Sequence, residues 1–204
     1  MPPYISIGGY SDPPRISYFS LEVSTGELVA LTGAPGSGKS NLMKSIAGIR
    51  SASRGSIRII GARPGSIRAR ERAVFVFQSG NFSPDLSMRI QLERKTALLR
   101  GVPVRMVKKD VRNWCEDMEL AEAAESTPGQ LNRSQVQMFA FAPLALSNPL
   151  VAVLDEPLAN LSSLRTSTAL SIVFSLLKKD SSVLVLAQKK SPLATKADRT
   201  MSLL

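Results

Sequence analysis

The residues whose types and spacing most clearly suggest chemistry form a glycine-rich run that ends in lysine and serine. Residues 33–40 read GAPGSGKS and fit the spacing G-x-x-x-x-G-K-[ST], between an apolar segment that begins at residue 28 and a helix-periodic segment at 41–49. In such a loop, backbone N–H groups surround phosphate oxygens, and the helix that follows directs the positive end of its dipole toward them. The run therefore predicts a phosphate site made by Gly33, Ala34, Pro35, Gly36, Ser37, Gly38, Lys39, Ser40 and Asn41.

The last two residues of this run extend its chemistry. We expect Lys39 to reach the β and γ phosphates of a nucleoside triphosphate and Ser40 to offer its hydroxyl to Mg²⁺. Pro35 has no N–H to donate, but its fixed φ stiffens the loop. ATP and Mg²⁺ are therefore the expected ligands.

An acidic pair follows a second apolar segment. LVAVL at 150–154 runs into Asp155 and Glu156, and ligands of open α/β sheets bind where buried strands end. We expect Asp155 to hold Mg²⁺ through water and Glu156 to polarise an attacking water and accept its proton. Such a pair is also common in turns and helix caps, and its combination with the phosphate loop favours the functional interpretation.

Composition excludes histidine and cysteine chemistry. The 204 residues include no histidine and one cysteine, Cys115, so they offer no Ser-His or Cys-His nucleophile pair, no histidine-ligated zinc and no internal disulfide. A single cysteine favours a reducing compartment, and the sequence has neither an apolar run long enough for a membrane span nor the layout of a signal peptide. We expect a protein of the cytoplasm.

Positive charge is concentrated in one part of the chain. Residues 50–112 hold 15 Lys and Arg against 4 Asp and Glu, whereas the whole chain has a formal charge of +10. Such a stretch suits an anionic partner, but a solvated surface is the preferred explanation, because no aromatic residues interleave the charges as base stacking requires. Nucleic acid is therefore not the expected partner.

Short apolar runs alternate with amphipathic segments, which indicates an α/β fold. Residues 28–33, 73–77, 150–154 and 182–187 are rich in Val and Leu and predict a mostly parallel core sheet. Alternating segments broken by Gly and Pro predict a small antiparallel β lobe at about 4–27 and 54–66. Helical spacing from Val104 to Met118 predicts an inserted helical lobe at about 83–147, within a single domain of residues 1–204.

The order of these motifs resembles the ABC-type ATPases, the P-loop NTPase subunits of ATP-driven transporters, from about Tyr4 to Leu204. The resemblance implies that Tyr10, sixteen residues before Gly26, stacks on adenine. It also implies that Gln78 matches the glutamine that contacts Mg²⁺ and bridges to the lobe touching an integral-membrane permease. The expected location is then the inner face of the plasma membrane, as a peripheral subunit.

Three motifs depart from the family pattern. The LSGGQ motif, which caps the ATP bound to the opposite subunit, aligns with LNRSQ at 131–135, so that Arg133, Ser134 and Gln135 occupy the trans-capping positions. Ser162 stands where the family has an acidic residue, and Gln188 stands at the position of its switch histidine. Arg133 either obstructs the approach to the partner's nucleotide or clamps its γ-phosphate.

The resemblance therefore predicts a dimerising subunit that binds ATP and hydrolyses it slowly, because the loss of one preorganised donor typically lowers a rate by ~10²–10³. The dimer forms with an identical chain or with a second ABC subunit whose capping motif is intact. The alternatives are a nucleotide-binding regulator that does not hydrolyse ATP, a nucleic-acid-associated ABC-like ATPase and a small-molecule P-loop kinase.

Overall fold

Five parallel strands form the centre of the molecule, in the order β5-β6-β7-β3-β8. The computed structural model describes residues 2–203, so Met1 and Leu204 lie outside the described part of the chain. The strands are β3 (Leu28–Thr32), β5 (Ala73–Val76), β6 (Val151–Asp155), β7 (Ser182–Ala187) and β8 (Arg199–Ser202). Four of them are the strands that the apolar runs predict, which confirms the mostly parallel α/β sheet.

The edge strand β8 is the exception, because its sequence has no apolar run that would predict a strand. Its four residues are exposed or half-buried, and it pairs only with β3 along one edge of the five-stranded sheet. An edge strand with one solvated side does not need the continuous apolar sequence of a covered strand. The sequence consequently reads as a C-terminal tail where the structure has a strand.

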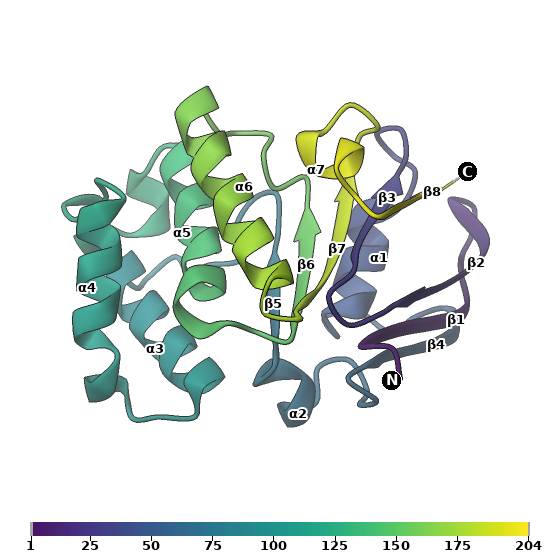
Figure 1. The fold of residues 1–204 in the computed structure, drawn as a ribbon, viewed down its shortest axis with the longest axis horizontal. Helices are drawn as coiled ribbons and strands as arrows, with labels where there is room; N and C mark the ends of the chain where they lie inside the picture. Colours follow the sequence, from purple (N-terminus) through teal and green to yellow (C-terminus); the bar gives the residue numbers. More distant parts are fainter. Residues whose placement is uncertain (1, 204) are drawn as a thin grey trace.

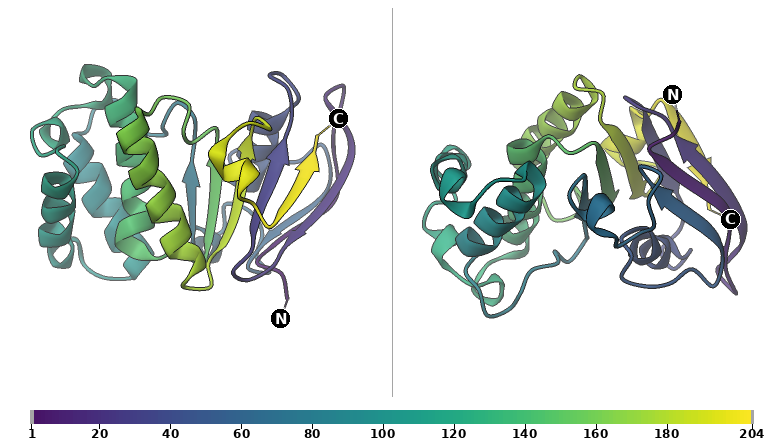
Figure 2. Two further views of the ribbon diagram at one scale, coloured as in Figure 1. Left: turned by 45° about the horizontal axis from the view of Figure 1, so that its top comes forward. Right: turned by 90° about the horizontal axis from the view of Figure 1, so that it is seen from below.

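A second, three-stranded antiparallel sheet has the order β2-β1-β4, with β1 (Ile5–Asp12), β2 (Ile16–Val23) and β4 (Arg54–Ile59). Its inner face and helix α1 (Lys39–Ile46) share one apolar core with the central sheet, to which β3 contributes Val29 and Leu31. Figure 2 shows these purple and blue strands at the opposite end of the molecule from helices α3 to α5.

The opposite face of the central sheet is covered by helices. Leu28 and Ala30 of β3 pack in a second core with α5 (Arg133–Ser147), α6 (Ser163–Leu177) and α7 (Pro192–Thr195). Figure 1 shows this arrangement, with α5 and α6 beside β6 and β7 and with α1 on the side of the antiparallel sheet. Alternate residues of one strand thus face two different cores, as a covered parallel strand requires.

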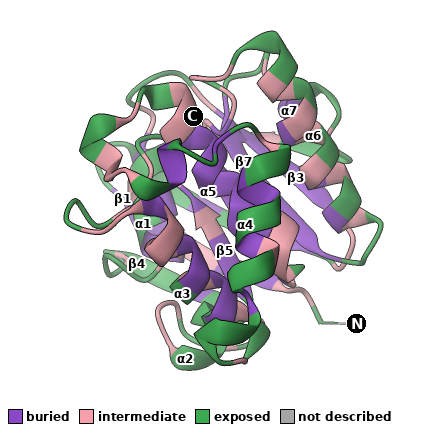
Figure 3. Cartoon of the chain, turned by 90° about the vertical axis from the view of Figure 1, so that its left-hand side faces the viewer, coloured by how far each residue is buried: buried purple, intermediate pink, exposed green. Residues whose placement is uncertain are grey.

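The segment between β5 and β6 forms a third apolar core of its own. It is built from α3 (Met88–Arg100), α4 (Lys108–Asp117) and α5, with Trp114 and Phe139 at a ring-centroid distance of 6.3 Å. Figure 3 shows α4 with exposed residues on its outward face and buried residues behind it. The short helix α2 (Ile67–Arg70) and three 3₁₀ turns, Val104–Met106, Ala123–Glu125 and Pro128–Gln130, complete the described elements.

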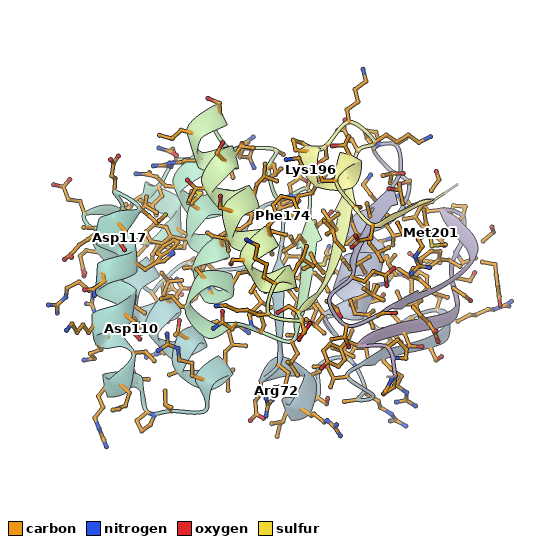
Figure 4. The ribbon with its side chains drawn as sticks, in the orientation of Figure 1. Arg72, Asp110, Asp117, Phe174, Lys196 and Met201 are labelled. Carbon is orange, nitrogen blue, oxygen red and sulfur yellow. The ribbon has the colours of Figure 1, made fainter. Side chains whose placement is uncertain are left out.

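A cation–π contact adds to the pairing of β8 with β3 and to the packing of α7 in the second core. Lys196 Nζ, just after α7, lies 5.5 Å from the centre of the Phe174 ring on α6, and Figure 4 shows the two side chains next to each other. Such a cation over an aromatic face is worth about 0.5–1 kcal/mol when exposed. Among residues 2–203, no helix combines the length and the apolar character needed to span a bilayer.

Candidate functional site

A cavity of about 360 Å³ opens at the carboxyl ends of β3 and β6. The phosphate loop, the acidic pair, Gln78 and Gln188 meet there, although they are far apart in the sequence. The residues that line the cavity are Arg15, Pro35, Gly36, Gly38, Lys39, Ser40, Asn41, Gln78, Asp155, Glu156, Ala159 and Gln188. This edge of an open parallel sheet is where such folds bind ligands.

The loop between β3 and α1 has a left-handed backbone at two glycines, and a third glycine lies close to a serine hydroxyl. Gly36 and Gly38 have φ values of 83° and 94°, in the left-handed region. At Gly33 a Cβ atom would lie 2.5 Å from Ser37 Oγ. A Cβ at Gly38 would approach Ile16 to 3.0 Å. The curled loop and the N-terminus of α1 together form an anion cradle of the kind that holds phosphates.

Lys39, the first residue of α1, is 7% exposed and turned back over the loop. Its Nζ donates hydrogen bonds of 2.6 Å to the Gly33 carbonyl and 3.1 Å to the Ala34 carbonyl. It also lies 3.8 Å from Oε1 of Glu156. The ammonium therefore sits at the centre of the cradle, beside both the loop and the carboxylate predicted to activate water.

Asp155 ends β6 and is only 3% exposed. Burial raises the pKa of this carboxyl group, and the Ser40 hydroxyl, Lys39 and Lys44 oppose the rise. Its Oδ1 atom has no hydrogen-bond partner among residues 2–203. An unpartnered buried carboxylate oxygen beside a serine hydroxyl is a suitable donor set for Mg²⁺, which prefers oxygen ligands and is usually held by one or two carboxylates together with substrate phosphates.

Glu156 follows with a φ of 44°, an uncommon left-handed conformation for a residue with a long side chain. Burial raises the pKa of its carboxyl group; the charge of Lys39 and the backbone N–H of Gln188 oppose this rise, and the charge of Asp155 adds to it. A carboxylate whose pKa is moved upward takes a proton more readily. The backbone is thus held in a strained form where it aims this side chain into the cavity.

Tyr10 does not have the predicted place. Its side chain is 1% exposed in the core between the antiparallel sheet and α1, where its hydroxyl lies 3.3 Å from Ser45 Oγ. The prediction that it stacks on adenine is therefore wrong. The reason is a β-bulge: Ile7 pairs with Leu21 but Tyr10 pairs with Phe19, so an extra residue turns Tyr10 to the inner face.

Asn41 lies on the cavity wall, but its side chain is engaged elsewhere. Its Nδ2 donates to Asp12 Oδ2 at 3.0 Å, and the same carboxylate accepts two bonds from Arg50 and one from Ser53. Burial alone would raise the pKa of Asp12, but the hydrogen bonds from Arg50, Asn41 and Ser53 outweigh it, so the pKa is lowered. The carboxylate links the end of β1 to α1.

Two further arginines near the predicted site residues were missed by sequence reasoning. Arg15 lines the cavity, and its Cβ would lie 3.2 Å from a Cβ at Gly38. Arg165, on α6, donates from Nη1 to Ser134 Oγ at 3.2 Å. The only available signal for Arg15 is its place in the Pro-Pro-Arg turn between two strands, and nothing in the sequence pairs Arg165 with position 134.

The trans-capping residues form the start of α5. Asn132 is the N-cap and accepts from the Gln135 N–H at 2.9 Å, while Gln135 Oε1 accepts from the Asn132 N–H at 3.1 Å. Arg133 is exposed beside them. Of the predicted residues, Gln135 and Ser134 thus have partners within the chain, and Arg133 lines a separate cavity.

We expect Asp155→Asn to raise the stability of the nucleotide-free chain near neutral pH by about 0.5–2 kcal/mol. Because the folded-state pKa of Asp155 is raised, the stability that the protonated form contributes is present at low pH and is lost as the pH rises through that pKa. The amide removes this loss. Thermal unfolding checks the result, and the gain should vanish below about pH 4.

The matched control for this substitution is Asp85→Asn at an exposed position, which should change stability by less than about 0.5 kcal/mol. An Asp155→Asn protein that is less stable than the parent at neutral pH would show that the carboxylate supports the fold.

Comparison with known families and proteins agrees with this geometry. The family model described as "ABC transporter" matches residues 16–159. The chain is 31% identical over 190 residues to the ABC transporter ATP-binding protein YbbA of Escherichia coli, which covers 90% of this chain and 83% of that protein. It is 32% identical over 153 residues to the sn-glycerol-3-phosphate import ATP-binding protein of Rhizobium etli, covering 74% of this chain but 44% of that protein.

A solved structure shares the fold. The dimeric post-hydrolysis state of an ATP-binding cassette bound to ADP and Pi superimposes with a TM-score of 0.82 at 21% identity, covering 97% of this chain and 93% of that one. At this identity the likeness shows the fold alone. This chain spans less than half the length of the Rhizobium etli relative, which therefore contains a large part with no counterpart here.

Proposed function

Because this chain belongs to the ABC transporter family, we propose that it binds ATP with Mg²⁺ and hydrolyses ATP slowly for a membrane permease. The observation that carries the proposal is the meeting of Lys39, Asp155 and Glu156 at one cavity, with Lys39 Nζ 3.8 Å from Glu156. Equilibrium dialysis of the pure chain tests it. With Mg²⁺ present, ATP should be taken up, and no uptake at millimolar ATP would contradict the proposal.

Each residue has a task in the proposed reaction. The loop amides and Lys39 hold the triphosphate, and Ser40, Asp155 and Gln78 hold Mg²⁺, which neutralises phosphate charge when bound. Glu156 accepts the proton of the attacking water, because its raised pKa suits a general base. We assign the adenine side of the cavity to Arg15, since a guanidinium plane stacks on a base as an aromatic ring does.

Slow hydrolysis follows from the glutamine at the switch position. Gln188 lines the cavity and its backbone N–H faces Glu156, but its side chain carries no titratable proton. A non-hydrolysing regulator is the alternative that the same residue favours. Phosphate release from ATP without any added acceptor separates these two functions, and it also excludes a kinase.

We expect Gln188→His to raise the rate of phosphate release about tenfold or more, because an imidazole beside the γ-phosphate supplies a donor that the glutamine replaces poorly. Release of phosphate under saturating ATP measures the effect. Lys189→His, at the next and equally exposed position, is the control and should leave the rate unchanged. An unchanged rate in Gln188→His would mean that the switch position does not limit hydrolysis.

We further propose that the chain dimerises with an identical or a different ABC subunit and that Arg133, Ser134 and Gln135 cover the partner's γ-phosphate. Arg133 is suited to this task because it is exposed and a guanidinium binds phosphate in a bidentate manner. The start of α5 is fixed for it by the Asn132–Gln135 capping box and by Arg165.

The permease contact is proposed at the lobe beside Gln78. A cavity of about 430 Å³ lies there between β5, α3 and α5, with Phe75, Phe77 and Phe82 in its lining and Arg94 and Lys95 beside them. An apolar cavity of this kind suits a segment of a partner protein. The chain would then lie on the cytoplasmic side of the plasma membrane. Co-purification from membranes should recover a multi-span protein with it, and recovery of the chain alone would contradict this part.

A further inference from the structure

A second cavity lies behind the nucleotide cavity, between the central sheet and the start of α5. It has a volume of about 590 Å³, and Ser40, Gln78 and Asp155 line both cavities. The residues that this second cavity does not share with the first include Lys44, Arg133 and Gln137. The two cavities therefore meet at the residues that hold Mg²⁺ in the proposed function.

Gln137 gives this cavity a requirement for a polar occupant. The side chain is 1% exposed, and neither its Nε2 nor its Oε1 has a hydrogen-bond partner among residues 2–203. A buried amide left without partners loses about 1–3 kcal/mol, and native structures avoid this unless water, an ion or a ligand supplies the bonds. The occupant must both accept a hydrogen bond and donate one.

The charges of the lining select an anion. Lys44 of α1 and Arg133 of α5 are both exposed cations on the cavity wall, and Asp155 is the carboxylate among the lining residues. In the proposed function Mg²⁺ compensates the charge of Asp155, which leaves two positive side chains. Monohydrogen phosphate fits this set, because its oxygens accept from ammonium, guanidinium and amide groups and its hydroxyl donates to the amide oxygen.

We propose that this cavity binds the inorganic phosphate released by hydrolysis, on its way out of the nucleotide cavity past Ser40 and Asp155. The proposal rests on the proposed function, since it takes hydrolysis as the source of the phosphate. Lys44 supplies the charge and Gln137 the paired donor and acceptor. Product phosphate then leaves on the side of the helical lobe rather than through the loop that holds ADP.

The test measures binding of radiolabelled orthophosphate to the full chain saturated with ADP and Mg²⁺, by equilibrium dialysis. The parent chain should bind phosphate, and Lys44→Met and Gln137→Leu should each weaken it about tenfold, the loss expected for one hydrogen bond to a charged group. Lys109→Met, at an exposed position of α4, removes the same charge outside the cavity and should leave phosphate binding unchanged. Unchanged ADP affinity in all three variants shows that they are folded.

A second arm separates this cavity from the position of the γ-phosphate. When the nucleotide cavity holds a non-hydrolysable ATP analogue, the parent chain should still bind orthophosphate. Phosphate binding that disappears with the analogue, or that is equal in the parent, Lys44→Met and Gln137→Leu, would overturn the proposal, as would an ADP-loaded chain that binds no phosphate. A chain that takes up no ADP contradicts the proposed function itself.

Discussion

Lys39→Met is expected to weaken ATP binding about a hundredfold, the largest loss that any single side chain of the site should produce. The ammonium lies inside the loop, within 3.1 Å of two loop carbonyls and 3.8 Å from Glu156. Methionine keeps much of the stem and removes the charge that the triphosphate requires. Equilibrium dialysis with ATP and Mg²⁺ measures the change.

The control for this substitution is Lys109→Met, which removes a positive charge from α4 without touching the cavity. It should bind ATP as the parent does. Two loop carbonyls lose their hydrogen-bond donor in Lys39→Met, so thermal unfolding must be measured to check that this chain is folded. If folded Lys39→Met bound ATP as tightly as the parent, the loop would not be the phosphate site.

Glu156→Gln should lower the rate of ATP hydrolysis by ~10²–10³ while leaving ATP affinity within about threefold of the parent. Glutamine has nearly the same shape as glutamate but does not accept the proton of the attacking water. The neutral amide also no longer attracts the Lys39 ammonium, so Lys39 can interact with the triphosphate without competition from residue 156. Single-turnover phosphate release and nucleotide dialysis separate the two effects.

The same variant tests the dimer, because it retains ATP. Size-exclusion chromatography with ATP and Mg²⁺ should show a larger dimer fraction for Glu156→Gln than for the parent, and adding Arg133→Ala should lower that fraction if the guanidinium clamps the partner's phosphate. A dimer fraction that rises with Arg133→Ala would mean that the side chain obstructs the contact.

If the parent chain shows no measurable hydrolysis and Glu156→Gln does not change this result, the non-hydrolysing regulator is favoured.

The phosphate loop and the acidic pair could be predicted because each consists of adjacent residues in the sequence. Gly33 to Ser40 require a strand before them and a helix after them, and Asp155 must end a buried strand for the pair to meet the loop. Both conditions can be read from local apolar patterns. Because the carboxyl ends of parallel strands lie at one edge of the sheet, the two motifs are expected to meet there.

Tyr10 shows where such reasoning fails. Alternation after Ile5 and Ile7 places residue 10 on the outer face, but the bulge that includes Gly9, with a φ of 58°, turns it inward. A single inserted residue moves every later side chain of the strand to the other face. The spacing from Tyr10 to the phosphate loop is unaffected by the bulge, so it gives no sign of the change.

Partners across the fold were beyond prediction for a different reason. The contact of Arg165 with Ser134 joins α6 to α5 through two residues that are 31 positions apart in the sequence. The second cavity forms where α5 packs beside the sheet. Neither has a local pattern. Likewise, Gln137 reads as an ordinary polar residue in a helix, and only its burial without hydrogen-bond partners singles it out.

The carboxylate of Asp12 has a consequence for the way the molecule opens. Four hydrogen bonds from Asn41, Arg50 and Ser53 converge on it and join the first strand to the helix that begins at Lys39. Local unfolding of either β1 or α1 breaks these hydrogen bonds and exposes the other segment. The amide protons of β1 and α1 should therefore exchange with deuterium as a cooperative unit. Local fraying of the strand would then release the anchor of the helix, and a ligand that protects one should slow exchange in both.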